Sequence, residues 1–150
     1  NLQTLIDGNA DNKIALLASG DPLFYGIGAW LGRNLPAEKL VFHPNTSSIQ
    51  SAFARIGKPW QNAEVVSLHG RPLISLRAAL KSHSLYALLT DAKSSPELIA
   101  TELMEQGFAD ADCWVCEDLG GADEQIRAFT AQQLTHSKGF HDLNVVPSCG

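Results

Sequence analysis

The sequence predicts an α/β protein in which short apolar strands alternate with helices. Three observations support this class: continuous apolar runs, helical segments with one apolar face, and Gly, Pro or Asn at the turns between them. Apolar runs without polar alternation are typical of strands buried on both faces, so we expect mostly parallel sheets. The 150 residues suffice for one medium domain or two small ones.

In the first half, three strands are expected over residues 13–18, 39–43 and 63–68. A polar loop precedes the first strand, and a helix over residues 23–31 follows it. Turn residues then end each element before the next apolar run begins.

A helix over residues 49–56 is the best-marked element of the first half. Its apolar side chains lie three or four residues apart and therefore share one face: Ile49, Ala52, Phe53 and Ile56. Three hydroxyl residues that can cap its first turn precede it, namely Thr46, Ser47 and Ser48. Gly57 tolerates a left-handed conformation and is expected to end the helix.

The second half repeats the alternation. Strands are expected over residues 85–90, 112–116 and 143–146, and helices over residues 75–81, 94–106 and 123–134. Ser94 and Glu97 have the spacing of a capping box. The Gly-Pro cluster at residues 70–72 is the expected hinge. We therefore expect the remainder of an N-terminal α/β domain over residues 1–70 and a C-terminal α/β domain over residues 71–150.

Composition excludes several classes of protein. The net charge is −5, with 45% hydrophobic and 18% charged residues, which is typical of a globular domain and argues against a nucleic-acid partner. No apolar run approaches the roughly 20 residues of a membrane helix, so no membrane partner is expected. Three cysteines do not form a disulfide framework, and the start does not read as a signal peptide. We expect a cytoplasmic location.

The turn Ser19-Gly20-Asp21-Pro22 follows the first expected strand. In an open α/β sheet, ligands bind at the carboxyl ends of strands. Gly20 lets backbone approach a ligand closely, Asp21 offers an acceptor, and Pro22 suits the first turn of a helix. The alternative interpretation is an ordinary strand-to-helix turn in which Asp21 caps the helix.

The pair Cys113 and Cys116 does not predict a metal site. Positions i and i+3 of a strand point to opposite faces, so the two thiols would not converge. A second pair that would complete four zinc ligands is lacking, and we expect no metal.

Four ordered motifs together resemble the tetrapyrrole methylase family. They are Ser19-Gly20-Asp21-Pro22-Leu23-Phe24-Tyr25-Gly26, Pro44-Asn45-Thr46-Ser47-Ser48-Ile49-Gln50, Pro59-Trp60 and Ser67-Leu68-His69-Gly70-Arg71. Within the family, the likeness is greatest to the members that methylate C5 of precorrin-6Y or cobalt-precorrin-7 in cobalamin biosynthesis. The second half agrees through Leu89-Thr90-Asp91, Glu117-Asp118-Leu119-Gly120 and Leu143-Asn144-Val145-Val146.

The resemblance implies a methyltransferase with two α/β domains, S-adenosylmethionine in the cleft between them, and a homodimeric assembly. It implies nine cofactor-binding residues in three groups. These are Ser19, Gly20, Asp21 and Phe24 at the first strand end, Ser47 and Ser48 at the next, and Leu89, Thr90 and Glu117 from the second domain.

The substrate implied by the resemblance is a corrinoid precursor with many carboxylates. Arg71 and His69 follow a strand end, and an arginine fork suits a carboxylate. Tyr25 and Trp60 could stack on the macrocycle, although an aromatic side chain beside Gly or Pro more often packs in the protein. No catalytic base is assigned, because methyl transfer depends chiefly on orientation.

Two features depart from the family pattern. Nothing upstream of Lys13 matches the family's first strand and glycine-rich GxGPG loop, so an N-terminal segment is expected to be missing. Asn45 stands where the family usually has glycine, and asparagine tolerates left-handed backbone. The second module of the related decarboxylating enzymes is not expected here.

Two alternatives remain open. One is a methyltransferase of the same fold with an RNA or protein substrate, although the acidic charge disfavours RNA. The other is an inactive fragment that only dimerises.

Overall fold

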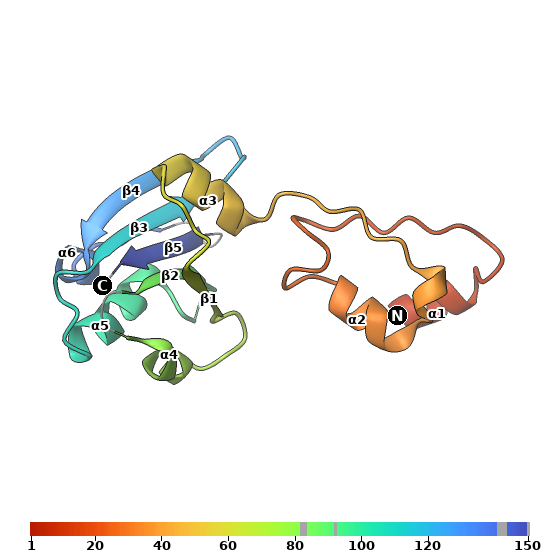
Figure 1. Cartoon of the computed structure of the whole chain (residues 1–150), viewed down its shortest axis with the longest axis horizontal. Helices are drawn as coiled ribbons and strands as arrows, with labels where there is room; N and C mark the ends of the chain where they lie inside the picture. The colour runs from red at the N-terminus through yellow and green to blue at the C-terminus, as the bar shows by residue number, and fades with distance from the viewer. Residues whose placement is uncertain (82–83, 92, 141–143, 150) are drawn as a thin grey trace. The chain divides into compact units, whose positions relative to one another are not determined.

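The computed structural model describes residues 1–81, 84–91, 93–140 and the backbone of residues 144–149. The chain divides into two compact units, Asn1–Asn45 (unit 1) and Thr46–Gly150 (unit 2). Figure 1 shows the helices and strands of each unit with their labels. The domain boundary expected at residue 70 falls inside unit 2, because strands from both sides of it pair in one sheet.

Unit 2 is built on one five-stranded sheet with the order β1-β2-β5-β3-β4. Its strands are β1 (Ala63–Ser67), β2 (Leu85–Leu89), β3 (Asp112–Glu117), β4 (Gln125–Thr130) and β5 (Asn144–Cys149). Strands β1 and β2 are parallel, which together with the flanking helices confirms the α/β class. The other three pairs are antiparallel, whereas we expected mostly parallel pairing.

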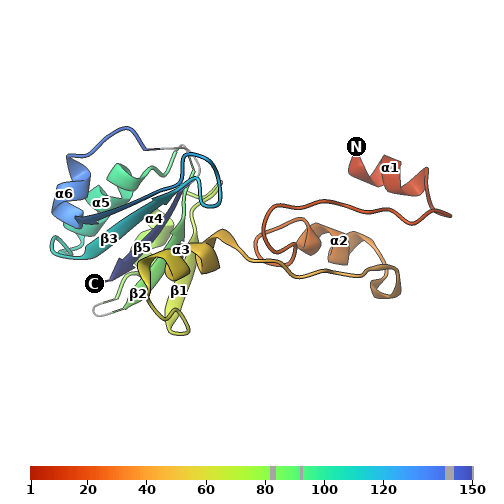
Figure 2. The same cartoon turned by 90° about the horizontal axis from the view of Figure 1, so that it is seen from above.

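Three helices cover one face of this sheet: α4 (Ile74–Ala79), α5 (Pro96–Glu105) and α6 (Ala131–Thr135). Figure 2 shows the layer from a second direction. Leu76 of α4, Ile99 of α5 and Leu134 of α6 are fully buried against Leu88 and Val115 of the sheet. This layer holds the larger of the two apolar clusters in the part of the chain that the structure describes.

Helix α3 (Ser48–Ile56) packs its apolar face onto a second apolar cluster. Ile49, Ala52 and Phe53 are buried with Ala87 of β2 and Cys116 of β3. The helix starts at its Ser47 cap and ends at Gly57, whose φ of 66° is left-handed. Each of these features of α3 confirms the expectation from its periodicity and end residues.

The helix expected over residues 123–134 is wrong in its first part. Residues 125–130 form β4, which pairs along its whole length with β3. Pairing satisfies the backbone groups of this segment that face β3, and its alternating side chains suit an edge strand. The helix begins only at Ala131, where Thr130 and Gln133 make a capping box.

The capping box expected at Ser94 is also wrong. Ser95 is the residue before α5, and no side chain hydrogen bond caps that helix. The Ser94 N–H donates to a side-chain oxygen of Asp91 instead. Leu143, the expected first residue of the last strand, lies outside the described residues.

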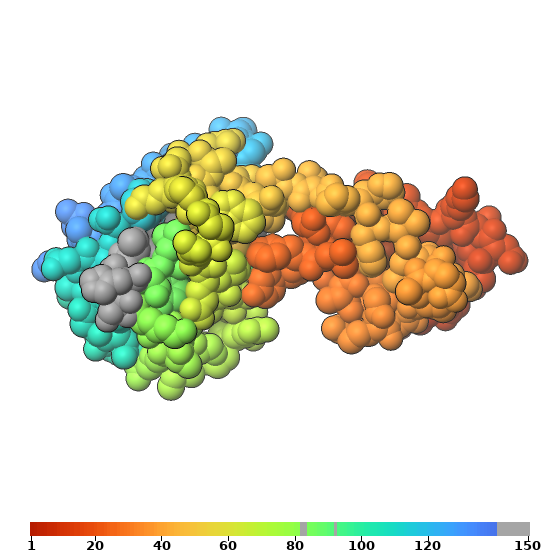
Figure 3. All heavy atoms as spheres, in the orientation of Figure 1, coloured from red at the N-terminus to blue at the C-terminus, as the bar shows by residue number. Residues whose placement is uncertain are grey.

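Unit 1 contains α1 (Leu2–Asp7), α2 (Gly28–Asn34) and the 3₁₀ helix η1 (Ala37–Lys39). The strands expected over residues 13–18 and 39–43 are wrong, since all of unit 1 is described and forms no strand. An apolar run becomes a strand only when a neighbouring strand takes its backbone hydrogen bonds. Leu17 is accordingly 99% exposed and Val41 79% exposed, and Figure 3 shows the surface of unit 1 in red and orange.

Among the described residues, no helix has the length and apolar character needed to cross a membrane.

The core of unit 2 predicts that alanine substitutions at two neighbouring positions of α5 lower the free energy of unfolding by different amounts. Ile99→Ala is expected to lower the free energy of unfolding by about 2–5 kcal/mol, because it leaves a cavity in the buried layer. Leu98, which is 45% exposed, provides the control, and Leu98→Ala should lower it by less than about 1 kcal/mol. Urea unfolding followed by circular dichroism measures both, and equal losses would contradict the assigned core.

Cys116 predicts a pH dependence of stability. Burial, followed by the charges of Glu124 and Glu117, raises the pKa of its thiol from 9.0 to about 12. The pKa is higher in the folded protein, so the stabilisation is present below pH 9 and is lost as the pH rises towards 12. Urea unfolding from about pH 8 to about pH 11 should show a steeper loss in the parent chain than in Cys116→Ala. Identical slopes would contradict a buried thiol.

Candidate functional site

Strands β1, β2 and β3 end at one edge of the sheet, which we call the carboxyl edge. Ser67 of β1 lies opposite Leu89 of β2 in a parallel pair. Strand β5 is antiparallel to both β2 and β3, so β3 runs in the same direction as β2. The carboxyl edge therefore brings together five residues of the predicted site: His69, Arg71, Leu89, Thr90 and Glu117.

The turn after β1 presents His69 and Arg71 as exposed side chains. Leu68 at its base is fully buried, and the Leu68 N–H donates to the Leu89 carbonyl at 2.9 Å. The Arg71 N–H donates back to the Leu68 carbonyl at 3.0 Å. Gly70 has a φ of 67°, a left-handed conformation that glycine adopts without strain. A fixed backbone thus carries two side chains that can reach a ligand.

Asp91, to which the sequence motifs assign no role, also lies at the carboxyl edge. One of its carboxylate oxygens accepts from the Gly70 N–H at 2.8 Å. The other accepts from the N–H groups of Lys93 at 3.0 Å and Ser94 at 2.8 Å. The Gly70 hydrogen bond is the largest cause that holds the pKa of Asp91 below its ordinary value. The sequence signal is an aspartate at a strand end followed by a serine three residues later, a common turn pattern.

Glu117 ends β3 with only 3% of its surface exposed. Its carboxylate accepts from Arg127 of β4 at 2.7 Å and 3.0 Å. The Arg127 guanidinium lies 4.5 Å from the centre of the Phe140 ring. A buried carboxylate needs such a partner, so the side chain of Glu117 is engaged within the protein. A ligand at this strand end would meet its backbone.

Ser47 and Ser48 lie at the first turn of α3. The Ser47 hydroxyl accepts from the Gln50 N–H at 3.3 Å, and the Gln50 side chain accepts from the Ser47 N–H at 2.9 Å. Ser47 is 8% exposed, and Ser48 is exposed. Ser47 therefore caps the N-terminus of α3. Ser48 is the next residue, and its side chain is accessible to solvent.

The other five residues of the predicted site lie in unit 1. They are Ser19, Gly20, Asp21, Phe24 and Tyr25. Gly20 is left-handed with a φ of 67°, and the Asp21 carboxylate accepts from the Leu23 N–H at 2.8 Å. The rings of Phe24 and Tyr25 meet edge to face at 5.0 Å, and both are exposed. This segment is a tight turn that follows an extended segment rather than a strand.

Gly28 explains why this turn is compact. Its N–H donates to the Pro22 carbonyl at 2.8 Å, and a Cβ added at Gly28 would lie 2.5 Å from the same oxygen. A Cβ at Gly26 would lie 2.7 Å from it. Both positions require glycine because the backbone of Pro22 occupies the space of a side chain.

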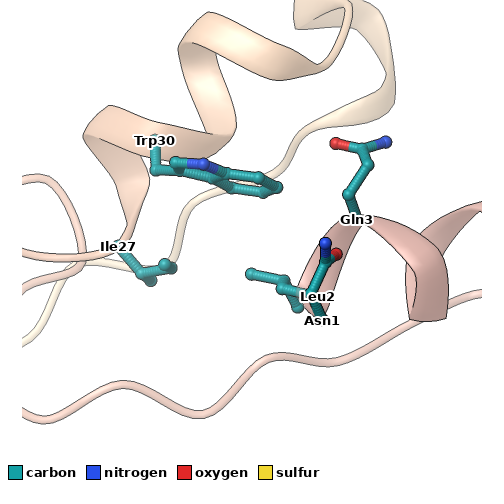
Figure 4. A pocket seen from close by; sticks show the side chains of 5 residues that line it. All are labelled: Asn1, Leu2, Gln3, Ile27 and Trp30. Carbon is teal, nitrogen blue, oxygen red and sulfur yellow. The ribbon is translucent and has the colours of Figure 1, made fainter.

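A hollow of about 340 Å³ in unit 1 lies between α1 and the start of α2. Figure 4 shows the side chains around it: Asn1, Leu2, Gln3, Ile27 and Trp30. Its lining is chiefly apolar and includes none of the predicted site residues.

The cysteines of β3 lie on opposite faces of the sheet, as their spacing predicted. Cys113 belongs to the cluster under α4, α5 and α6, and Cys116 to the cluster under α3. Across residues 1–81, 84–91 and 93–140, no group of three or more metal-ligating side chains comes together.

Comparison with known proteins identifies the family of this chain. Residues 3–135 match the family model of tetrapyrrole (corrin/porphyrin) methylases. A precorrin-6Y C(5,15)-methyltransferase (decarboxylating) of a Sinorhizobium species is 36% identical over 134 residues, which are 89% of this chain and 32% of that protein. A cobalt-precorrin-7 C(5)-methyltransferase of Salmonella typhimurium is 35% identical over 125 residues, 83% of this chain and 61% of that protein. The chain thus spans less than two thirds of either relative.

Solved structures share the fold. The uroporphyrin-III C-methyltransferase of Thermus thermophilus, solved with S-adenosylhomocysteine, matches 98% of this chain and 68% of its own. The TM-score is 0.74 at 17% sequence identity. The family model covers most of the chain, and both sequence relatives carry names from the same family. The chain belongs to the tetrapyrrole methylase family.

Proposed function

We propose that the protein is an S-adenosylmethionine-dependent methyltransferase that acts on C5 of a precorrin in cobalamin biosynthesis. The observation that carries this proposal is the 35–36% identity to two relatives named for methylation at this carbon. The family match over residues 3–135 supports the same chemistry. Precorrin-6Y and cobalt-precorrin-7 are both candidate substrates, because one relative is named for each.

The residues of the candidate site suit such a cofactor. When bound, this cofactor supplies a methyl group from a positively charged sulfur. As the methyl group is transferred, the sulfur keeps the electron pair of the broken carbon–sulfur bond and becomes neutral. Gly20 allows close backbone approach, and Asp21 retains acceptor capacity beyond its bond to the Leu23 N–H. In this proposal Ser19 and Phe24 join them in unit 1, Ser47 uses its backbone and Ser48 its exposed hydroxyl. Leu89, Thr90 and Glu117 contribute backbone atoms at the carboxyl edge.

In this proposal, these residues hold the cofactor in the orientation that methyl transfer requires. Methyl transfer requires the attacking carbon, the methyl group and the sulfur to lie in line, and holding that geometry can supply most of the acceleration. The Asp21 side chain, which contacts the cofactor in this proposal, is held by a hydrogen bond from the Leu23 N–H. Groups fixed in this way lose little further freedom when a ligand arrives.

Substrate recognition is proposed for His69, Arg71 and Tyr25. The Arg71 guanidinium is exposed beside a strand end and can bind a carboxylate through two parallel hydrogen bonds. His69 adds a second donor next to it, and Tyr25 offers an exposed ring for the macrocycle. The carboxylates of a corrinoid substrate can accept from Arg71 and His69.

We further infer a cytoplasmic homodimer. Family members usually form homodimers, and the odd number of cysteines suits a reducing compartment. Sedimentation equilibrium of the native protein tests the dimer, and a single monomeric species at micromolar concentration would contradict it.

The proposed cofactor site can be tested directly. Titration calorimetry of the native protein should show S-adenosylhomocysteine binding, and mass spectrometry should show one methyl group added to precorrin-6Y or cobalt-precorrin-7. Asp21→Asn keeps an acceptor for the Leu23 N–H but removes the charge, so affinity should fall about tenfold. Asp11→Asn, in an exposed loop of the same unit, is the matched control. No heat at millimolar ligand and no methylation would sink the proposal.

The proposed substrate site can be tested through Arg71. Arg71→Ala should raise KM for the corrinoid about tenfold, since it removes a charge-assisted bidentate contact, and should leave the affinity for S-adenosylhomocysteine unchanged. Arg33→Ala, exposed in the last turn of α2, should leave both constants unchanged. Steady-state kinetics measures the difference. An equal rise of KM in the two variants would contradict a specific contact between Arg71 and the substrate.

A further inference from the structure

The carboxylate of Asp91 joins two loops of the carboxyl edge. Its one oxygen accepts from the Gly70 N–H in the turn after β1, and its other oxygen accepts from Lys93 and Ser94 in the loop after β2. Three backbone donors from two loops therefore converge on one side chain. Lys93 and Ser94 are two and three residues from Asp91, whereas Gly70 is 21 residues away.

The Gly70 donor lies between the two proposed substrate-binding side chains. His69 precedes Gly70 and Arg71 follows it, and both are exposed. The backbone of the turn is held at its base by the bond from Leu68 to Leu89 and across itself by the bond from Arg71 to Leu68. The hydrogen bond to Asp91 joins the tip of this turn to the neighbouring strand end.

The ionised form of Asp91 is the form that this arrangement requires. A carboxylate offers acceptors on both oxygens, whereas a neutral amide offers them on one only. The Gly70 N–H, then the N–H groups of Ser94 and Lys93, and the charge of His69 hold the pKa of Asp91 below its ordinary value. Both oxygens are acceptors at neutral pH, as they are in any ionised aspartate, and the lowered pKa extends this to more acidic solution.

We propose that Asp91 is a positioning residue that, through its bond to the Gly70 N–H, holds Arg71 in the orientation that binds a substrate carboxylate. This inference rests on the function proposed above. Asp91 accepts from three backbone donors, so in this proposal it acts through the position of Arg71. The placement of a bidentate donor matters because a displaced guanidinium loses one of its two bonds to a carboxylate.

Asp91→Asn tests the proposal with almost no change of shape. The amide can accept from Lys93 and Ser94 or from Gly70, but its nitrogen faces the remaining donor. KM for the corrinoid should rise about fivefold to tenfold with kcat within about twofold, because the turn is displaced and the chemistry is untouched. Hydrogen exchange of the Gly70 amide should accelerate about tenfold, a readout that needs no activity. Asp112→Asn, at the opposite end of β3, is the matched control and should change neither.

A double-mutant cycle with Arg71→Ala separates positioning from general destabilisation. If Asp91 acts through Arg71, adding Asp91→Asn to Arg71→Ala should change KM by less than about twofold. Circular dichroism establishes that each variant is folded. Should the Asn variant be unfolded, Asp91→Glu, which keeps the charge on a longer side chain, enters the same cycle with the same expectation.

The outcomes distinguish the two proposals. An active parent protein whose KM is unchanged by Asp91→Asn, or in which the two substitutions raise KM independently, overturns the positioning role and leaves the function intact. A parent protein without methylation overturns the proposed function and, with it, this inference. A rise in KM that vanishes in the Arg71→Ala background supports both.

Discussion

The direction of strand β5 is the constraint on which the candidate site of unit 2 depends. Strand β5 lies between β2 and β3 and runs antiparallel to both. Two reversals restore the original direction, so β3 ends at the same edge as β1 and β2. If β5 were parallel to β2 and antiparallel to β3, Glu117 would lie at the far edge from His69 and Arg71. The backbone hydrogen bonds of one central strand thus decide which side chains share a site, because strand pairing is obligatory for buried backbone.

The sequence predicted elements whose signals are local. Helix α3 has its apolar stripe, its Ser47 cap and its Gly57 end within one short segment, and each was found where expected. The failures concern pairing between distant residues. Residues 13–18 have the composition of a strand but no partner strand within unit 1, whereas residues 125–130 become a strand because β3 lies beside them. Strand composition reports how well a segment suits a sheet and leaves open whether a partner is available.

The site shows the same division. Strand ends and glycine turns can be recognised in a sequence, so Leu89, Thr90 and Glu117 could each be assigned to the end of a strand, and His69 and Arg71 to the turn after one. Their common edge could not be predicted, because the domain boundary expected at residue 70 separated two strands that pair in one sheet. The hydrogen bond from Gly70 to Asp91 joins residues 21 positions apart and could not be predicted from spacing. Likewise, the partner of Glu117 is Arg127, which lies in the segment predicted as a helix. Polar side chains in the site therefore have structural roles that motif matching does not reveal.

The position of β5 along the chain has a consequence for synthesis. Of the described strands it is the last to leave the ribosome, yet it fills the middle of the sheet. Until it arrives, the β1–β2 pair and the β3–β4 hairpin each present an unpaired inner edge, and such edges are prone to pair with other chains. A nascent chain that stalls before residue 144 would expose both edges at once. Covering the unpaired edges of β2 and β3 during that interval would therefore reduce aggregation of the nascent chain.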